Sequence, residues 1–161
     1  MKASYQWLKE LVDFPFSPQE LAEKLTMVGL EVENLSNPSQ VYESTVVGEI
    51  VDIQPHPQAQ ELSLCRVYDG HGPRKIICGA KNIYPGAKVA LALPGTQLPR
   101  GDQITPEKIK GVVSEGMLCS GTELGLGNGS DGVLILRLDS KPGQTIIELL
   151  NLWDIILDVN I

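Results

Sequence analysis

The sequence predicts a mainly β protein with a small α+β annex. Apolar residues recur at helical spacing within about the first 40 residues. From about Val41 onward, short strand-like segments are separated by Gly and Pro, and strand-like alternation returns at the end of the chain. The 161 residues are 42% hydrophobic and 20% charged, a composition that excludes an intrinsically disordered chain and a repeat fibre.

Two helices are expected near the start of the chain. Ser4 can cap a helix that ends at about Val12, because the residues between them place apolar side chains at helical spacing. The run Ser17-Pro18-Gln19-Glu20 has the pattern of a capping box with Pro at the first helical position. Gly29 suits the left-handed conformation that ends many helices. The apolar face of this second helix consists of Leu21, Leu25 and Val28.

The middle of the chain has the rhythm of a small all-β sandwich or barrel, with breaks rich in Gly and Pro such as residues 55–57. We expect residues 116–124 and 145–150 to be helical. Residues 125–129 are expected to form a turn and not a phosphate-binding loop, because no Lys-Ser or Lys-Thr pair follows their glycines. The expected strands are residues 45–53, 62–68, 75–78, 88–93 and 132–136.

The last residues of the chain alternate between apolar and mixed positions, as a strand does. One face of this strand would consist of Ile155, Leu157, Val159 and Ile161. We expect it to pair with a strand over residues 30–35, in one small sheet that the N-terminal helices cover, with residues 36–39 as a linker. Because the alternation continues to the last residue, we expect the chain to be a portion of a longer protein.

No set of residues typical of an enzyme active site is found. His56 and His71 do not lie at a metal-ligand spacing from a cysteine, which predicts that no metal is bound. The three cysteines form no Cys-x-x-Cys pair and lie in apolar surroundings, which favours free thiols in a reducing, cytoplasmic compartment. No segment approaches the ~20 apolar residues of a membrane-spanning helix. We therefore expect a cytoplasmic, non-catalytic chain with no membrane partner.

Charge is unevenly distributed along the chain. The net charge is −7, but residues 74–110 contain seven basic and two acidic residues, a net charge of +5. A basic stretch inside an acidic chain can attract phosphate, although lysines that only solvate a surface give the same pattern. A five-stranded OB barrel presents a concave face on which nucleic acid can lie. The candidate phosphate-binding residues are Lys81, Arg100, Lys108 and Lys110.

Several motifs, taken in order, are more specific than composition. They are Val47-Gly-Glu-Ile-Val-Asp-Ile-Gln-Pro-His56-Pro-Gln-Ala59, Leu62-Ser-Leu-Cys65-Arg-Val67, Ile77-Cys-Gly-Ala-Lys-Asn82, Val89-Ala-Leu-Ala-Leu-Pro-Gly95 and Lys108-Ile-Lys-Gly111-Val-Val-Ser114-Glu-Gly-Met-Leu-Cys-Ser120. Together they resemble the tRNA-binding OB module of bacterial phenylalanyl-tRNA synthetase β chains, methionyl enzymes and free-standing tRNA-binding proteins. The flanking residues 4–10, 21–33 and 156–161 resemble the phenylalanyl β chain in particular.

This resemblance implies an OB-fold barrel over residues 40–149, inserted in a small α+β domain. The first part of that domain would be residues 1–39, and residues 150–161 would begin its returning part. It also implies an α₂β₂ ligase that attaches phenylalanine to tRNA with ATP and magnesium, whose catalytic site lies in the α subunit, so that this chain binds neither cofactor. The RNA-binding residues that it implies here are Lys81, Asn82, Arg100, Lys108, Lys110 and Ser120.

Two departures from the family pattern reduce the expected attraction for phosphate. Members often have Asp-Lys where this chain has Gln60-Glu61, and they often carry more lysines where it has Thr105-Pro106-Glu107. Two alternatives therefore stay open beside an auxiliary tRNA-binding role in the ligase. One is a free-standing, dimeric tRNA-binding protein, and the other is a purely structural module that packs subunits together.

Overall fold

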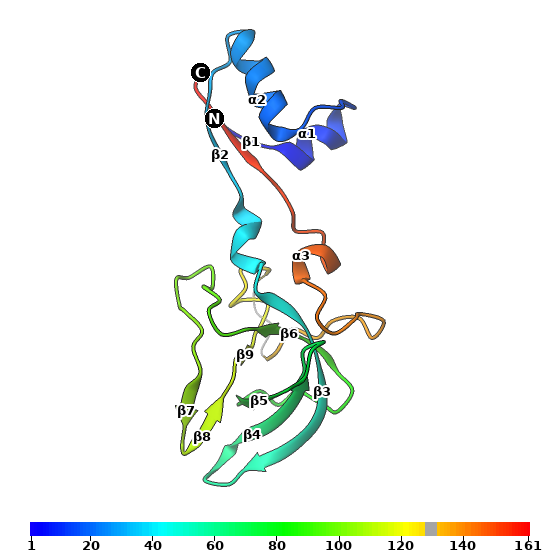
Figure 1. Ribbon diagram of the computed structural model, residues 1–161, viewed down its shortest axis with the longest axis vertical. Helices are drawn as coiled ribbons and strands as arrows, with labels where there is room; N and C mark the ends of the chain where they lie inside the picture. Colours follow the sequence, from blue (N-terminus) through cyan, green and yellow to red (C-terminus); the bar gives the residue numbers. More distant parts are fainter. Residues whose placement is uncertain (128–131) are drawn as a thin grey trace. The chain divides into compact units, whose positions relative to one another are not determined.

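The computed structural model describes residues 1–127 and 132–161 (Figure 1). The chain forms two compact units, one made of Met1–Gln40 with Leu152–Ile161 and the other of Val41–Asn151, here called the α/β unit and the β unit. Strands predominate over helices, as the sequence predicts. The turn expected over residues 125–129 extends into residues 128 and 129, which lie outside the described residues.

The α/β unit contains a three-stranded antiparallel sheet of order β1-β10-β2, formed by Lys2–Ser4, Ile156–Val159 and Val32–Ser36. The predicted pairing of the segments around residues 30–35 and 155–161 is confirmed, with Leu157 opposite Leu35. Strand β1 was not predicted, because three residues are too few to show an alternation. The last strand of the chain thus lies between two strands from its beginning.

Both predicted N-terminal helices are present, α1 over Tyr5–Leu11 and α2 over Pro18–Met27. Ser4 caps α1 by accepting a hydrogen bond from the Trp7 amide, and its hydroxyl donates to Asp154 Oδ2 at 2.6 Å. The Ser17–Glu20 capping box of α2 is complete in both directions. Asp154, which precedes β10, therefore joins the two sequence segments of this unit.

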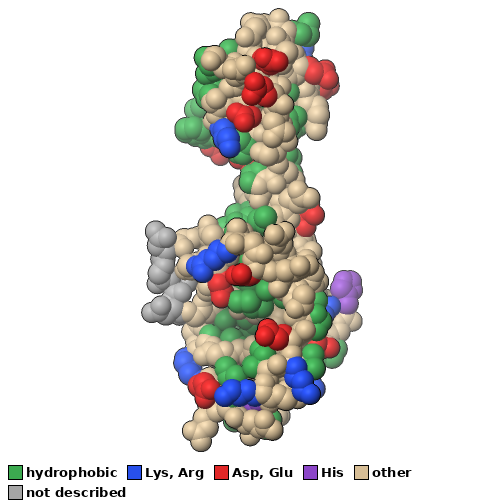
Figure 2. All heavy atoms as spheres, turned by 90° about the vertical axis from the view of Figure 1, so that its left-hand side faces the viewer, with side chains coloured by type: hydrophobic (Ala, Val, Ile, Leu, Met, Phe, Trp, Pro, Cys, Tyr) green, Lys and Arg blue, Asp and Glu red, His purple; other side chains and the backbone are tan. Residues whose placement is uncertain are grey.

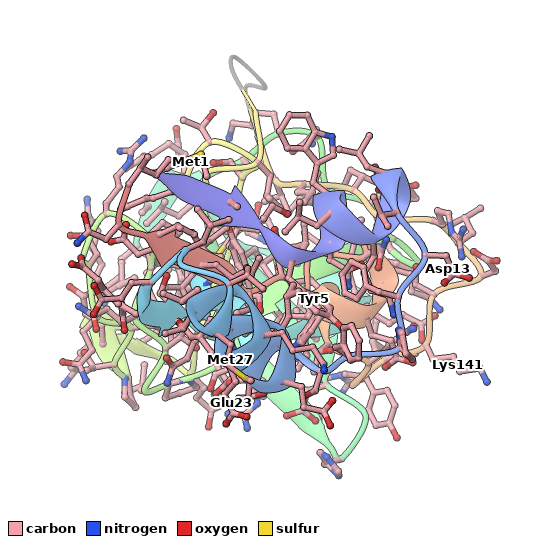
Figure 3. All side chains as sticks on the ribbon, turned by 90° about the horizontal axis from the view of Figure 1, so that it is seen from above. Met1, Tyr5, Asp13, Glu23, Met27 and Lys141 are labelled. Atoms are coloured by element: carbon pink, nitrogen blue, oxygen red, sulfur yellow. The ribbon has the colours of Figure 1, made fainter. Side chains whose placement is uncertain are left out.

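The core of the α/β unit lies between the helices and the sheet. Tyr5, Leu157 and Val159 are buried, and Leu21 and Leu25 of α2 pack against them. Figure 3 shows Tyr5 near the centre of this unit. The expectation that Val28 and Ile161 also face this core is wrong, since they are 76% and 85% exposed. Each lies just beyond the end of its element, where the periodicity no longer sets the direction of a side chain.

The β unit is built on a five-stranded antiparallel sheet of order β5-β4-β3-β6-β9. The edge strand β5 is hydrogen-bonded to the segment that leads into the other edge strand, β9: the Glu115 amide donates to the Lys75 carbonyl at 2.8 Å. The Ile77 amide also donates to Ser114 Oγ at 3.0 Å. The sheet is therefore curled into a small barrel around an apolar core. Its strands are β3 (Thr45–His56), β4 (Ala59–Tyr68), β5 (Pro73–Cys78), β6 (Lys88–Ala92) and β9 (Met117–Leu118).

An additional hairpin, which the sequence did not predict, consists of β7 (Glu107–Ile109) and β8 (Val112–Ser114). Its two-residue turn has Lys110 at φ +46° and Gly111 at φ +89°. Positive φ at both central residues is the type I′ arrangement that matches the twist of a hairpin. The strands are short and the first is mostly charged, so the alternation that would reveal them is missing.

Four other segments differ from their predictions. Residues 132–136 form no strand, and only an isolated bridge joins Val89 to Ile135. Residues 116–124 begin as strand β9 and continue as a single turn, because Ser120 and Glu123 close that turn locally. The expected linker over residues 36–39 consists of the end of β2 and the start of the 3₁₀ helix η1 (Pro38–Tyr42). The chain break expected at residues 55–57 lies later than predicted, because β3 continues through His56. The predicted helical turn after Thr145 is confirmed as α3 (Ile146–Leu149).

Candidate nucleic-acid interface

The β7–β8 hairpin presents two of the predicted phosphate-binding residues. Lys108 and Lys110 are both exposed; Lys108 lies on β7 and Lys110 in the turn that follows it. Lys110 occupies a turn position where Asn, Asp or Gly is preferred. A lysine is uncommon in the left-handed region for steric reasons. A strained position of this kind points to a use for the side chain that occupies it.

Glu61 on β4 brings Lys110 together with Lys81. Lys81 Nζ donates to the Glu61 carbonyl oxygen at 3.1 Å, and Lys110 Nζ lies 3.8 Å from Glu61 Oε1. Both members of the Lys110–Glu61 pair are more than half exposed, so solvent screens their attraction. We call Lys81, Lys108 and Lys110 the lysine patch. It carries three positive charges, with the Glu61 carboxylate beside Lys110 and the exposed Glu107 next to Lys108 in the chain.

A hollow of about 330 Å³ lies between this hairpin and strands β4 and β5. Figure 2 looks at the molecule from the side of β7 and β8, and in the β unit it shows Lys and Arg side chains with a few acidic ones around a hydrophobic area. This surface therefore combines positive charge with an apolar hollow. The apolar side chains that line the hollow are Leu62, Ile77, Ile104, Ile109 and Met117.

Arg100 does not join the lysine patch through any contact among the described residues. It lies in a separate exposed turn, where the Gly101 amide donates to the Leu98 carbonyl at 2.8 Å. The neighbouring Pro99 packs beside Gly125. The proximity of Arg100 to Lys108 in the sequence therefore does not show that the two bind the same phosphates.

Asn82 has a structural contact that the sequence analysis missed. Its amide nitrogen donates to the Val133 carbonyl at 2.9 Å, and its oxygen accepts from the Val133 amide at 3.1 Å. Gly132 has φ +120°, and a Cβ there would come within 2.4 Å of Asn82 Oδ1. Asn82 thus pairs with the backbone of an irregular segment, which no short-range pattern in the sequence could reveal.

Ser120 also uses its polar groups within the fold. Its hydroxyl accepts from the Glu123 amide at 3.1 Å, and Glu123 Oε2 accepts from the Ser120 amide at 2.7 Å, the reciprocal bonds of a capping box. The Ser120 hydroxyl also donates to Glu123 Oε2 at 3.0 Å. The Ser-x-x-Glu spacing over these two residues is the signal that could have indicated this role. Of the six candidate residues, the structure brings Lys81 and Lys110 together, with Lys108 two positions away.

The thiols of the β unit are unsuited to chemistry. Cys65, Cys78 and Cys119 are free and buried. Burial raises the pKa of Cys65 and of Cys119 to about 12, so neither is a thiolate at neutral pH. Within residues 1–127 and 132–161, no cluster of His, Cys, Asp or Glu side chains is arranged to hold a metal ion. Over the same residues, no helix is long and apolar enough to cross a bilayer.

The fold and these exposed lysines define a small curled β module with a basic surface. Residues 45–145 match the protein family described as "Putative tRNA binding domain". The match covers more than half of the chain, and the chain belongs to this family.

Two relatives have nearly the whole chain in common with this protein. It is 46% identical to the phenylalanine–tRNA ligase beta subunit of Syntrophotalea carbinolica over 96% of its length, and 44% identical to that of Legionella pneumophila over its full length. The alignments cover 19% and 20% of those relatives, so the chain spans about a fifth of their length. A solved MetRS related protein from Pyrococcus horikoshii is 22% identical, with a TM-score of 0.46 over 63% of this chain and 86% of that one.

Proposed function

We propose that this chain is a non-catalytic part of a phenylalanine–tRNA ligase β subunit and that its β unit is an auxiliary tRNA-binding module. The observation that carries the proposal is the family match over residues 45–145 together with the exposed lysine patch on that same region. The names of the relatives, at 44–46% identity, support the ligase context. We interpret the curled sheet with its added hairpin as an OB-fold.

The tRNA would be bound by its phosphates. Lys81 and Lys110 meet at Glu61 and Lys108 follows on the same hairpin, so the patch can approach one stretch of RNA backbone. In the β unit the tyrosines Tyr68 and Tyr84 are exposed, which is a thin platform for base stacking. Recognition of backbone charge and shape is therefore favoured over the reading of successive bases.

The ligase reaction would take place elsewhere. The complete enzyme would be an α₂β₂ assembly in the cytoplasm that uses ATP and magnesium at the α subunit, and the buried, protonated thiols of this chain support a role without chemistry. With phenylalanine, ATP, magnesium and tRNA, the chain alone is expected to form no aminoacyl bond. Turnover that rises with the concentration of the purified chain would contradict this.

A structural role is the second candidate, and two residues favour it. Asn82 and Ser120 use their side-chain groups to hold Val133 and Glu123. Polar residues engaged in this way stabilise the β unit whether or not RNA binds. If the whole unit has only this role, it packs against other subunits and has no salt-dependent affinity for tRNA.

The salt dependence of tRNA binding separates these candidates. For the 161-residue chain, the logarithm of the binding constant should fall linearly with the logarithm of salt concentration. Replacing Lys108 and Lys110 together by Gln should weaken binding to phenylalanine tRNA and to an unrelated tRNA alike, and should reduce the slope by about 0.7–0.9 per lost contact. The matched control replaces the exposed Lys2 and Lys141, with the same change in net charge.

An equal loss of affinity in the Lys108/Lys110 variant and in the Lys2/Lys141 control would show that only general charge attraction is at work. An unchanged slope in the Lys108→Gln/Lys110→Gln variant would remove these residues from the interface. No measurable binding at low salt by the unmodified chain would favour the structural role.

A further inference from the structure

The β7–β8 hairpin carries two lysines of the patch, but its own ladder is only three residue pairs long. An isolated hairpin of this kind is marginally stable in water. Its position on the barrel must therefore come from contacts to other elements. At the end near Ser114, that contact is the bond from the Ile77 amide.

At the turn end, the contact comes from a histidine on another hairpin. His56 is the last residue of β3, is only 4% exposed, and lies beside the turn that leads into β4. Its Nε2 is 3.0 Å from the carbonyl oxygen of Ile109, 53 positions away in the sequence. Ile109 is the last residue of β7 and directly precedes Lys110.

The hydrogen-bond partners determine the tautomer of this imidazole. The backbone amide of Gln58 donates to Nδ1 at 3.0 Å, so Nδ1 carries no proton. Nε2 therefore carries the proton and donates it to the Ile109 carbonyl. Both ring nitrogens are satisfied, as a buried polar side chain requires.

This arrangement ties the tips of two hairpins together. One bond orders the turn after β3, and the other fixes the residue before Lys110. The Gln58 side chain also approaches the same turn, where a Cβ on Gly111 would lie 3.8 Å from it. His56 thus holds in place the left-handed turn from which Lys110 reaches toward Glu61.

We propose that His56 is a positioning residue for RNA phosphate binding: it sets the β7–β8 hairpin so that Lys108 and Lys110 lie together with Lys81. This inference rests on the proposed function. His56 itself is buried, so in this proposal it acts through the hairpin and not by contact with the RNA.

Three substitutions test it in the 161-residue chain. His56→Gln can place an amide nitrogen near the position of Nε2 and keep the donor to Ile109. His56→Asn is too short to reach Ile109 but can still accept from the Gln58 amide. His56→Phe fills a similar volume and removes both bonds.

The Asn and Phe variants should bind tRNA about threefold to tenfold more weakly, the range that one buried hydrogen bond supports, and with a smaller salt slope. The Gln variant should stay within about twofold of the unmodified chain. Amide hydrogen exchange should accelerate in β7 and β8 for Asn and Phe, with the core strands β3, β4 and β6 unchanged. If the His56→Phe variant lowers the melting temperature of the whole β unit, the His56→Asn variant is the one to compare with the unmodified chain.

A double-mutant cycle separates positioning from general damage. In a Lys108→Gln/Lys110→Gln background, His56→Asn should cause no further loss of affinity, because the residues that it positions are gone. An undiminished loss in that background overturns the proposal, as does unaltered exchange of β7 and β8 in the Asn variant. If the unmodified chain binds no tRNA, the proposed function fails, while the exchange data still decide whether His56 holds the hairpin.

Discussion

At the scale of single residues, Lys110 combines a strained backbone with an exposed positive charge. It occupies a left-handed position at φ +46° in a two-residue turn, a conformation that is costly for an ordinary L-residue. Asn adopts this conformation more readily and is common in type I′ turns. The turn should therefore be more stable with Asn at this position, and under the proposed function the lysine contributes its charge.

We predict that Lys110→Asn stabilises the β unit and weakens tRNA binding. The expected gain in the free energy of unfolding is about 0.5–1 kcal/mol, since part of the left-handed penalty is relieved. Denaturant titration and tRNA binding at fixed salt measure the two effects. Lys108→Asn is the control: it should weaken binding and slightly destabilise the unit, because Asn is a poor strand residue. Loss of stability in Lys110→Asn would contradict the argument.

Glu61 is the residue that opposes the lysine patch. Its carboxylate lies 3.8 Å from Lys110 Nζ and would compete with an RNA phosphate for that ammonium group. We predict that Glu61→Gln raises tRNA affinity by about twofold to fivefold, within the range for one exposed ion pair. Glu107→Gln removes an exposed carboxylate from β7 with the same change in net charge. Equal effects of the two variants would show that only the overall charge matters.

At the scale of elements, the turn between β4 and β5 depends on one buried carboxylate. Asp69 accepts hydrogen bonds from the amides of His71 and Gly72 at 2.8 and 2.9 Å, and it pairs with Arg74. Burial alone would raise its pKa, but these hydrogen bonds and the Arg74 charge together lower the pKa of Asp69 below its usual value. The ionised form therefore stabilises the folded turn.

This predicts a pH dependence of stability at the acid end. The contribution of Asp69 is complete above its unfolded pKa of about 3.9, and it is lost as pH falls through the lower folded pKa. Asp69→Asn should lower the free energy of unfolding at pH 7 by about 1–3 kcal/mol, and it should flatten its decline below about pH 4. Asp139→Asn, at an exposed carboxylate, is the control. Parallel pH profiles for Asp69→Asn and the unmodified chain would rule this out.

How far the sequence predicts each element depends on the range of the interactions that form it. The helices after Ser4 and Ser17 depend on contacts within four residues, and the sequence predicts them closely. The β7–β8 hairpin and the segment held by Asn82 depend on partners about 50 positions away, such as His56 and Val133. The sequence predicts which lysines are candidates for the site, but not how they are arranged in space. Their gathering at Glu61, and the separate place of Arg100, follow from strand register and could not be predicted from the chain alone.

At the scale of the whole molecule, the two units differ in how many segments of the chain form them. The β unit is one continuous segment, whereas the sheet of the α/β unit has a C-terminal strand between two N-terminal ones. Removing residues 155–161 takes away this central strand and the buried Leu157 and Val159. We predict that the deletion exposes α2 and β2 to amide hydrogen exchange and leaves the β3–β6 strands protected. Equal protection of α2 and β2 after the deletion would show that the N-terminal segment folds by itself.

The central position of β10 also has a consequence for biosynthesis. During translation the first 40 residues leave the ribosome without the strand that completes their sheet, and they wait while more than 100 further residues are added. The β unit becomes complete in that interval and can fold first, against the usual N-to-C order of domains. Its folding brings the two ends of a long loop together, so the late strand finds its partners at a reduced entropic penalty. Until that strand is made, Tyr5, Leu21 and Leu25 of the nascent N-terminal segment stay uncovered. This is the stage of synthesis at which a chaperone would find the most exposed apolar surface to bind.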